Sequence, residues 1–249
     1  MKKSFDVEYA RLNEDQKRAV DTVEGPVMVV AGPGTGKTQT VAMRVANILR
    51  KTQAKPGNVL CLTFSNSGAT AMRERLRKLI GPDAYGVHVN TIHGFCNEII
   101  LQNPQVFEQW SALEQISDVE RYRAVRRIID EMMPDLELVN KKDPHRGISD
   151  ILSRMSLFKR EGKADPAELL RIADENEAAL SVASRAGTKA HENNLRKARK
   201  FRDLVRVFIR YQEVLKETQR YDYDDMILGV IRALTEEDWL LASQQERYL

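Results

Sequence analysis

The hydrophobic positions of this chain follow one pattern in its first hundred residues and another in the rest. Short apolar runs at Val27–Val30, Val59–Thr63 and Gly86–Asn90 have the length and β-branching of buried parallel strands. Helical periodicity precedes the first run and follows each of them, with helices predicted to begin near Leu12, Gly36, Asn66 and Thr91. This alternation predicts a parallel α/β layer that extends to about Leu101.

From about Asn103 to Gln219 the strand signals disappear and helical periodicity continues. Asp165 and Pro166 are typical of the N-cap and first position of a helix, which we expect to run through Ala173. The polar stretches Lys141–Gly147 and Ser181–Asn194 are predicted to be loops. The pattern therefore predicts an all-helical region inserted into the α/β layer.

A basic segment near the end of that region favours a long helix. Residues Lys189–Lys216 contain nine Lys or Arg and three acids, and a continuous helix of this length would extend about 40 Å. Its apolar stripe consists of Ala198, Phe201, Val205 and Phe208. The charges are either a solvated helix face or phosphate contacts, and Arg199 and Arg206 are the candidate contacts.

Composition narrows the class of protein without naming a function. The 249 residues are 42% hydrophobic and 30% charged, which is ordinary globular usage, and the net charge of +3 is only weakly basic. The two cysteines, Cys61 and Cys96, stand in apolar contexts, which argues against a disulfide framework and for a reducing compartment. No apolar run approaches the ~18 residues of a membrane span, so we expect a cytoplasmic protein without a membrane partner.

The strongest chemical signal lies in Val27–Thr38, which reads VMVVAGPGTGKT. Glycines let a backbone bend so that its N–H groups converge on phosphate oxygens, while a lysine reaches the outer phosphates and a hydroxyl binds Mg²⁺. The pattern GxxxxGK[ST] is met except at Ala31. A chance glycine-rich turn is the weaker interpretation, because a strand pattern precedes the loop and a helical pattern follows it. The predicted phosphate and Mg²⁺ ligands are Gly32, Gly34, Thr35, Gly36, Lys37 and Thr38.

Other motifs allow both a structural and a functional interpretation. Asn13 and Gln16 form a potential capping box, which alone would explain both residues. Phe64 and Asn66 follow the second strand, and Thr91 and His93 follow the third. An aromatic at the carboxyl end of a parallel strand lies on the ligand face of the sheet, where it can stack on a base. Asn66 can equally be a cap, and His93 a solvated or core histidine.

The segment Ile128–Glu131 resembles the strand that supplies catalytic carboxylates in P-loop enzymes. Val125, Ile128, Ile129 and Met132 lie at helical spacing, however, and two arginines interrupt any buried strand. We expect a helix here, so the carboxylate-bearing strand is missing from the sequence pattern.

Five segments in register resemble the UvrD/Rep family of superfamily 1 DNA helicases. They read LNEDQKRAV, AGPGTGKT, LTFSNSGATAMRERL, VNTIHGFCNEII and YDYDDMI, and their order spans nearly the whole chain. The resemblance implies a RecA-like P-loop domain in residues 1–102, an inserted helical subdomain in 103–220 that also touches DNA, and a return to the motor domain in 221–249. It also implies an ATP-dependent enzyme that couples hydrolysis to stepping along single-stranded DNA and separating duplex.

The resemblance assigns roles residue by residue. It implies that Gln16 reads the adenine, that Lys37 and Thr38 hold phosphates and Mg²⁺, and that Gln39 lies beside the base. The residues on the single-stranded DNA track would be Phe64, Asn66, Thr91 and His93. Three positions depart from the family pattern: Gln39 stands where many members have Arg, and Ser67–Gly68 where many have Lys-Ala.

The expected carboxylate strand would begin where the chain stops, so we expect an N-terminal part that depends on the remaining motor domains of its parent and hydrolyses little ATP alone. Two other classes remain open. One is a P-loop kinase or another non-helicase ATPase, which a phosphoryl-acceptor screen would distinguish. The other is a non-catalytic nucleotide- or DNA-binding module.

Overall fold

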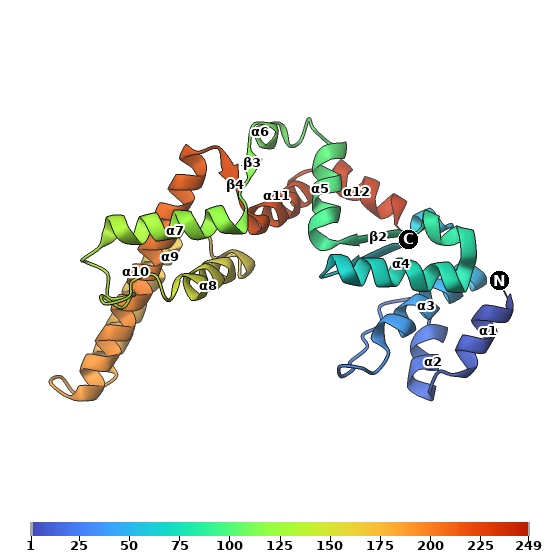
Figure 1. Ribbon diagram of the computed structural model, residues 1–249, viewed down its shortest axis with the longest axis horizontal. Helices are drawn as coiled ribbons and strands as arrows, with labels where there is room; N and C mark the ends of the chain where they lie inside the picture. Colours follow the sequence, from blue (N-terminus) through green and yellow to red (C-terminus); the bar gives the residue numbers. More distant parts are fainter. Residues whose placement is uncertain (1, 249) are drawn as a thin grey trace. The chain divides into compact units, whose positions relative to one another are not determined.

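The computed structural model describes residues 2–248, with the side chains of all except residues 2–4 and 111. The chain divides into two compact units (Figure 1). Unit 1 consists of residues 1–103 and 230–249, and unit 2 of residues 104–229. Each unit has its own hydrophobic core. The buried residues of the unit 1 core lie between Phe5 and Val89 in the sequence, and those of the unit 2 core lie between Ile116 and Leu215.

Two of the first three helices of unit 1 form where the polar and apolar pattern predicts them, whereas α1 was not predicted. Helix α1 spans Lys2–Ala10, α2 spans Glu14–Asp21 and α3 spans Lys37–Lys51. Val20 of α2 and Ala42, Met43 and Ala46 of α3 are fully buried, so these helices pack their apolar faces into one core. The predicted helices near Leu12 and Gly36 are thus confirmed.

A two-stranded parallel sheet lies at the centre of unit 1. Strand β1 spans Leu60–Thr63 and pairs in parallel with β2, His88–Thr91, so that Thr63 lies opposite Thr91. Helices α4 (Asn66–Ile80) and α5 (Ile92–Gln102) leave the carboxyl ends of these strands. Short 3-10 helices at Pro56–Asn58 and Gly81–Gly86, together with α12 (Asp238–Arg247), complete the unit. The two predicted βα units are confirmed, with β2 shifted by one or two residues.

The predicted strand Val27–Val30 does not form. The segment has no regular secondary structure, and Met28 and Val30 are 90% and 86% exposed. A strand needs a neighbour to accept and donate its ladder hydrogen bonds. Within residues 2–248, β1 and β2 pair with each other and no segment pairs with 27–30. The sequence pattern identified a segment whose composition suits a buried strand. The sheet of unit 1 was expected to have three strands, and in the described residues it has two.

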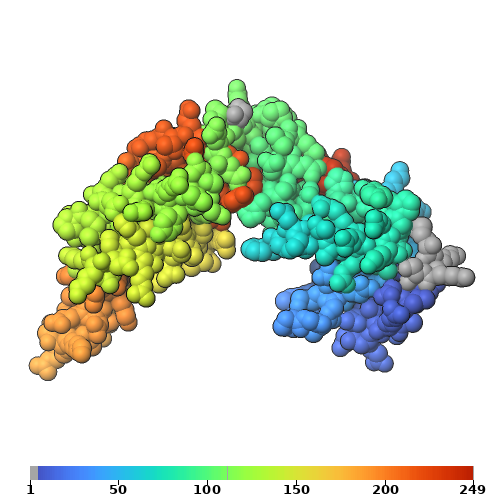
Figure 2. Space-filling model, viewed as in Figure 1, coloured from blue at the N-terminus to red at the C-terminus, as the bar shows by residue number. Residues whose placement is uncertain are grey.

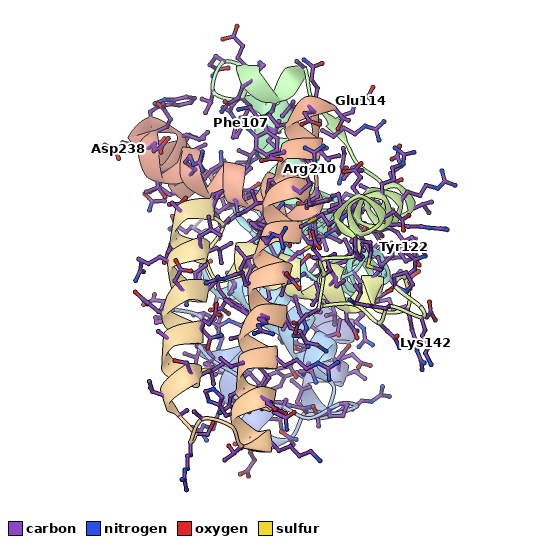
Figure 3. The ribbon with its side chains drawn as sticks, turned by 90° about the vertical axis from the view of Figure 1, so that its left-hand side faces the viewer. Phe107, Glu114, Tyr122, Lys142, Arg210 and Asp238 are labelled. Atoms are coloured by element: carbon purple, nitrogen blue, oxygen red, sulfur yellow. The ribbon has the colours of Figure 1, made fainter. Side chains whose placement is uncertain are left out.

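Unit 2 is almost entirely helical. Its helices are α6 (Glu108–Ser111), α7 (Asp118–Met132), α8 (Ile148–Arg160), α9 (Pro166–Val182), α10 (Lys189–Glu217) and the first half of α11 (Tyr223–Glu236). Helices α9 and α10 pack along each other as a hairpin (Figure 3), and the loop between them is its exposed tip (Figure 2). The unbroken α10 and the start of α9 at Asp165-Pro166 confirm two predictions.

Three expectations for this region are corrected. Helix α9 continues past Ala173 to Val182, and α10 begins at Lys189, so the loop predicted at Ser181–Asn194 is much shorter. Asp165 and Thr188 cap the two helices through their side-chain oxygens, which fixes both starts. A short parallel strand pair, β3 (Glu114–Gln115) with β4 (Arg220–Tyr221), is also present, although no strand was expected between Asn103 and Gln219. Two-residue strands carry too little periodicity to be seen in a sequence.

A buried ionic cluster ties α8 to the YDYDDMI motif. The Lys159 ammonium, 1% exposed, lies 2.8 Å from an Asp222 carboxylate oxygen and 2.6 Å from one of Asp225. Burial opposes ionisation of Asp222, but Lys159 holds the pKa of this carboxyl below its ordinary value. Burial and the charge of Asp222 raise the pKa of Asp225. The Tyr211 hydroxyl also donates to Asp222, so this motif is a packing element of unit 2.

Two further expectations concern compartment and membrane. Cys61 and Cys96 are free and buried, and burial raises the pKa of the Cys61 thiol to about 11. None of the helices in the described part of the chain is long and apolar enough to span a bilayer.

Candidate nucleotide and nucleic-acid site

The glycine-rich loop has the backbone geometry of an anion cradle. Gly34 and Gly36 adopt φ values of 77° and 83°, a left-handed conformation that residues with a Cβ rarely adopt. Gly36 is the N-cap of α3, and no side chain caps that helix end, so the first N–H groups of α3 have no side-chain acceptor. An N-terminus of this kind attracts negative charge, because the helix dipole is positive there.

Lys37 lies folded across the same loop. Its ammonium donates to the carbonyl oxygens of Ala31 at 3.1 Å and Gly32 at 2.6 Å, while the Thr35 hydroxyl donates to the Gly32 carbonyl at 2.8 Å. Lys37 is exposed, and Thr38 is half-buried in the first turn of α3. The loop thus places an exposed cation, a hydroxyl and uncapped helix N–H groups together, a donor set that fits polyphosphate with Mg²⁺.

Gln16 forms the capping box expected from the sequence and also contacts the phosphate loop. Its side-chain oxygen accepts from the Asn13 backbone N–H at 3.0 Å, and its own backbone N–H donates to the Asn13 side-chain oxygen at 2.9 Å, which confirms the capping box. Its side-chain nitrogen donates to the Thr35 carbonyl at 3.0 Å. The cap therefore holds an amide side chain directly beside the phosphate loop.

Gln39 connects three helices beside that loop. Its amide nitrogen donates to Glu8 of α1 at 3.2 Å, and its oxygen accepts from Arg75 of α4 at 2.9 Å. Glu8 and Arg75 were not predicted, because no motif links residues so distant in the sequence. The structure brings an arginine next to the position where many family members carry one.

The four other unit 1 candidates gather at the carboxyl ends of β1 and β2. Phe64 follows β1 and is 83% exposed, and Asn66, the first residue of α4, is also exposed. Thr91 ends β2 and caps α5 by accepting from the Gly94 N–H at 3.0 Å, and His93 lies in the first turn of that helix. Because Thr63 and Thr91 are register partners, the two motifs emerge side by side from one sheet edge. Phe64 is therefore a side chain available to a ligand and not a core residue.

Gly68 explains one departure from the family pattern. A Cβ at this position would lie 2.5 Å from the Thr63 hydroxyl oxygen and 3.2 Å from that of Ser65. The N-cap of α4 is Ser65, whose hydroxyl accepts from the Gly68 N–H at 3.1 Å. The first turn of α4 thus approaches the end of β1 so closely that it has no room for the alanine found in many relatives.

Unit 2 holds Arg199 and Arg206 in ion pairs. Arg199 lies 3.1 Å from Glu137, and Arg206 lies 3.4 Å from Asp203 on the same helix. Both side chains remain about half exposed. Contact with phosphate would therefore compete with existing carboxylate partners.

The segment Ile128–Glu131 is helical, as expected, and lies within α7. Ile128 and Ile129 are buried, whereas Asp130 pairs with His145 at 2.7 Å and Glu131 with Arg210 at 3.8 Å. Nowhere in the described residues do three His, Cys, Asp or Glu side chains converge as a metal site.

Comparison with known proteins places this geometry in a family. Residues 12–249 match the UvrD/REP helicase N-terminal domain, and the chain therefore belongs to that family. The family implies a RecA-like P-loop fold and the use of ATP. The chain is 25% identical over 237 residues to the ATP-dependent DNA helicase PcrA of Staphylococcus aureus, and 26% identical over 238 residues to PcrA of Bacillus subtilis. In both alignments 95% of this chain matches 28% of the relative, so it spans little more than a quarter of their length.

Proposed function

We propose that this chain is the ATP- and single-stranded-DNA-binding part of an ATP-dependent DNA helicase. The observation that carries the proposal is the phosphate loop, in which Gly34 and Gly36 adopt left-handed conformations, Lys37 crosses the loop and the Gln16 amide adjoins Thr35. A kinase would share the loop, but the exposed Phe64 at the adjacent sheet edge favours a nucleic-acid ligand.

In this proposal the loop N–H groups and the α3 dipole bind the phosphates of ATP. The Lys37 ammonium leaves the carbonyls of Ala31 and Gly32 to reach the outer phosphates, and the Thr38 hydroxyl joins the Mg²⁺ shell. Gln16 hydrogen-bonds the adenine, and Gln39 lies beside the base. Bound Mg²⁺ supplies charge neutralisation at the transferring phosphate.

Single-stranded DNA would cross the ends of β1 and β2. Phe64 stacks on a base, while Asn66, Thr91 and His93 contribute polar contacts along the strand. Arg199 and Arg206 of the helical unit would contact phosphates of the single strand, including at single-strand/duplex junctions, at the expense of their pairs with Glu137 and Asp203.

The whole activity belongs to a longer parent in this proposal. Translocation and unwinding, in DNA repair or replication in the cytoplasm, require the remaining motor domains, which supply the carboxylates and arginines that stabilise the transferring phosphate. The present chain is accordingly expected to bind nucleotide but to hydrolyse it close to the background rate.

The DNA contact is tested by fluorescence anisotropy with a labelled single-stranded oligonucleotide. Phe64→Ala should weaken binding by about 1–3 kcal/mol, because stacking is lost, with little change in salt dependence. Tyr85→Ala is the matched control, since Tyr85 is an aromatic of unit 1 with nearly the same exposure, 82% against 83%.

Equal affinity of Phe64→Ala and the unaltered chain would contradict the DNA placement. Equal losses in Phe64→Ala and Tyr85→Ala would show that general surface hydrophobicity, and not the strand-end position, controls binding. A third variant, Arg199→Ala with Arg206→Ala, should lower the salt slope by about 0.7 for each phosphate contact that it removes.

A further inference from the structure

A large open groove in unit 2 is lined by none of the candidate residues of the nucleotide site. Its volume is about 1050 Å³, and it is lined by the loop of residues 136–147, by α8 and by the N-terminal half of α10. In Figure 3, the loop that carries Lys142 lies on the side of α10 away from α9. The groove therefore uses a face of α10 that the α9–α10 hairpin leaves open.

The hydrogen bonds of Asp203 build one wall of this groove. Its carboxylate accepts from the backbone N–H groups of Glu137 at 2.7 Å and Leu138 at 3.1 Å, which fastens the loop to α10. Arg206 pairs with the same carboxylate, and Arg199 pairs with Glu137. The two backbone hydrogen bonds of Asp203 hold the loop against α10, so this wall of the groove is formed without a ligand.

Helix α10 divides its cations between two faces. Its arginines at 199, 202, 206 and 210 all have carboxylate partners. Arg196, Lys197 and Lys200 line the groove, and none of them has an ion-pair partner within residues 2–248 as described. Unpaired cations at a concave surface are positioned to meet an anionic ligand.

The opposite wall repeats this charge. Lys141, Lys142 and Arg146 of the loop, and Arg154 of α8, line the groove and likewise lack carboxylate partners among the described residues. The same rim carries three acids, Glu137, Asp143 and Asp150. The rim therefore carries more cations than carboxylates, and its net charge is positive.

The floor between these walls is aliphatic. Leu136, Ile151 and Leu204 are buried beneath it, and Leu138 and Val139 are half-buried at its surface. The one aromatic in the lining, Phe201, is half-buried and packs edge-on against Phe158 with ring centroids 6.0 Å apart. The floor thus offers apolar area for side chains without an open aromatic face on which a base can stack.

We propose that this groove is a docking site for an acidic peptide segment of a partner protein that carries aliphatic or aromatic side chains between its carboxylates. The ligand's carboxylates pair with the rim cations, its apolar side chains cover the aliphatic floor, and its backbone N–H groups find acceptors in the rim acids. Nucleic acid fits less well, because the three rim carboxylates repel phosphates and no stacking platform is present.

Fluorescence anisotropy of the intact 249-residue chain tests the proposal. The probe is a short fluorescein-labelled peptide rich in Asp and Glu with interspersed Leu and Phe. Lys197→Glu with Lys200→Glu should weaken its binding at least about tenfold. Lys189→Glu with Lys216→Glu makes the same charge change on the same helix outside the groove, and should leave most of the affinity intact.

Two further probes separate the ligand classes. A peptide with Ser in place of Leu and Phe should bind more weakly than the first, because it cannot cover the floor. Equal affinity of these two peptides, equal losses in the two double variants, or no binding of the acidic peptide would overturn the proposal. Loss of oligonucleotide binding in Lys197→Glu with Lys200→Glu, with peptide binding unchanged, would also overturn it and assign the groove to nucleic acid.

Discussion

The two units use a lysine in opposite ways. In unit 1 the exposed Lys37 rests on the carbonyls of Ala31 and Gly32 at the surface of a loop. In unit 2 the buried Lys159 is enclosed between Asp222 and Asp225. Lys37 belongs to the phosphate-loop motif and is accessible to a ligand, whereas Lys159 lies in α8 and is buried against the YDYDDMI motif.

This difference shows how a motif's chemistry depends on burial. Carbonyl partners at an exposed site are exchanged at little cost, because water or a ligand can replace them. A buried ammonium between two carboxylates cannot lose its partners without leaving a charge in a medium of low dielectric constant. The YDYDDMI segment thus stabilises unit 2, whereas the phosphate loop is available for binding.

The largest expected effect follows from removing the buried cation. Lys159→Met preserves length but leaves Asp225 without its cation and Asp222 with only the Arg121 guanidinium, 3.8 Å away. It should lower the free energy of unfolding by about 3–5 kcal/mol. Urea unfolding followed by circular dichroism measures the loss. Lys37→Met, the matched control in unit 1, should change stability by less than about 0.5 kcal/mol. Equal losses of unfolding free energy in Lys159→Met and Lys37→Met would contradict the claim that only the buried lysine stabilises its unit.

A second comparison uses two glycines. Gly68→Ala in unit 1 places a Cβ 2.5 Å from the Thr63 hydroxyl oxygen and should cost about 1–3 kcal/mol through overpacking. Gly147→Ala in unit 2 meets no atom within 4 Å and should be nearly neutral. Thermal unfolding of the two variants checks this order. A neutral Gly68→Ala would mean that the first turn of α4 can move away from β1.

The smallest expected effect is a pH dependence in unit 2. Hydrogen bonds from Arg220, then from the Ser117 hydroxyl and N–H, lower the pKa of Glu120 from 4.5 to about 2. Because the folded-state pKa is depressed, this stabilisation is present above pH ~4.5 and is lost as the pH falls towards 2. The free energy of unfolding of Glu120→Gln should therefore vary less with pH across this range than that of the unaltered chain. Urea unfolding midpoints measured at a series of acidic pH values check this. Glu161→Gln is the surface control, and an equal flattening there would contradict the assignment.

Local signals in the sequence predicted much of the fold and part of the site. Helix starts depend on residues a few positions apart, so the cap at Asn13 with Gln16 and the start at Asp165 with Pro166 could be read directly. The exposed position of Phe64 followed from strand order, because parallel strands end at one sheet edge.

Features that depend on distant partners could not be predicted. The strand expected at Val27–Val30 failed because apolar periodicity does not reveal whether a neighbouring strand is available. Lys159 meets carboxylates more than sixty residues away, and Arg75 meets Gln39 across 36 positions. No local pattern records either contact.

The central claim is that the phosphate loop of unit 1 binds nucleotide, and calorimetric titration with Mg-ATP or Mg-ADP tests it most directly. Lys37→Ala removes a charge-assisted phosphate contact and should weaken binding by about 1.5–3 kcal/mol, while its unfolding free energy stays that of the unaltered chain. Nucleotide affinity that is the same in Lys37→Ala and in the unaltered chain would contradict the account.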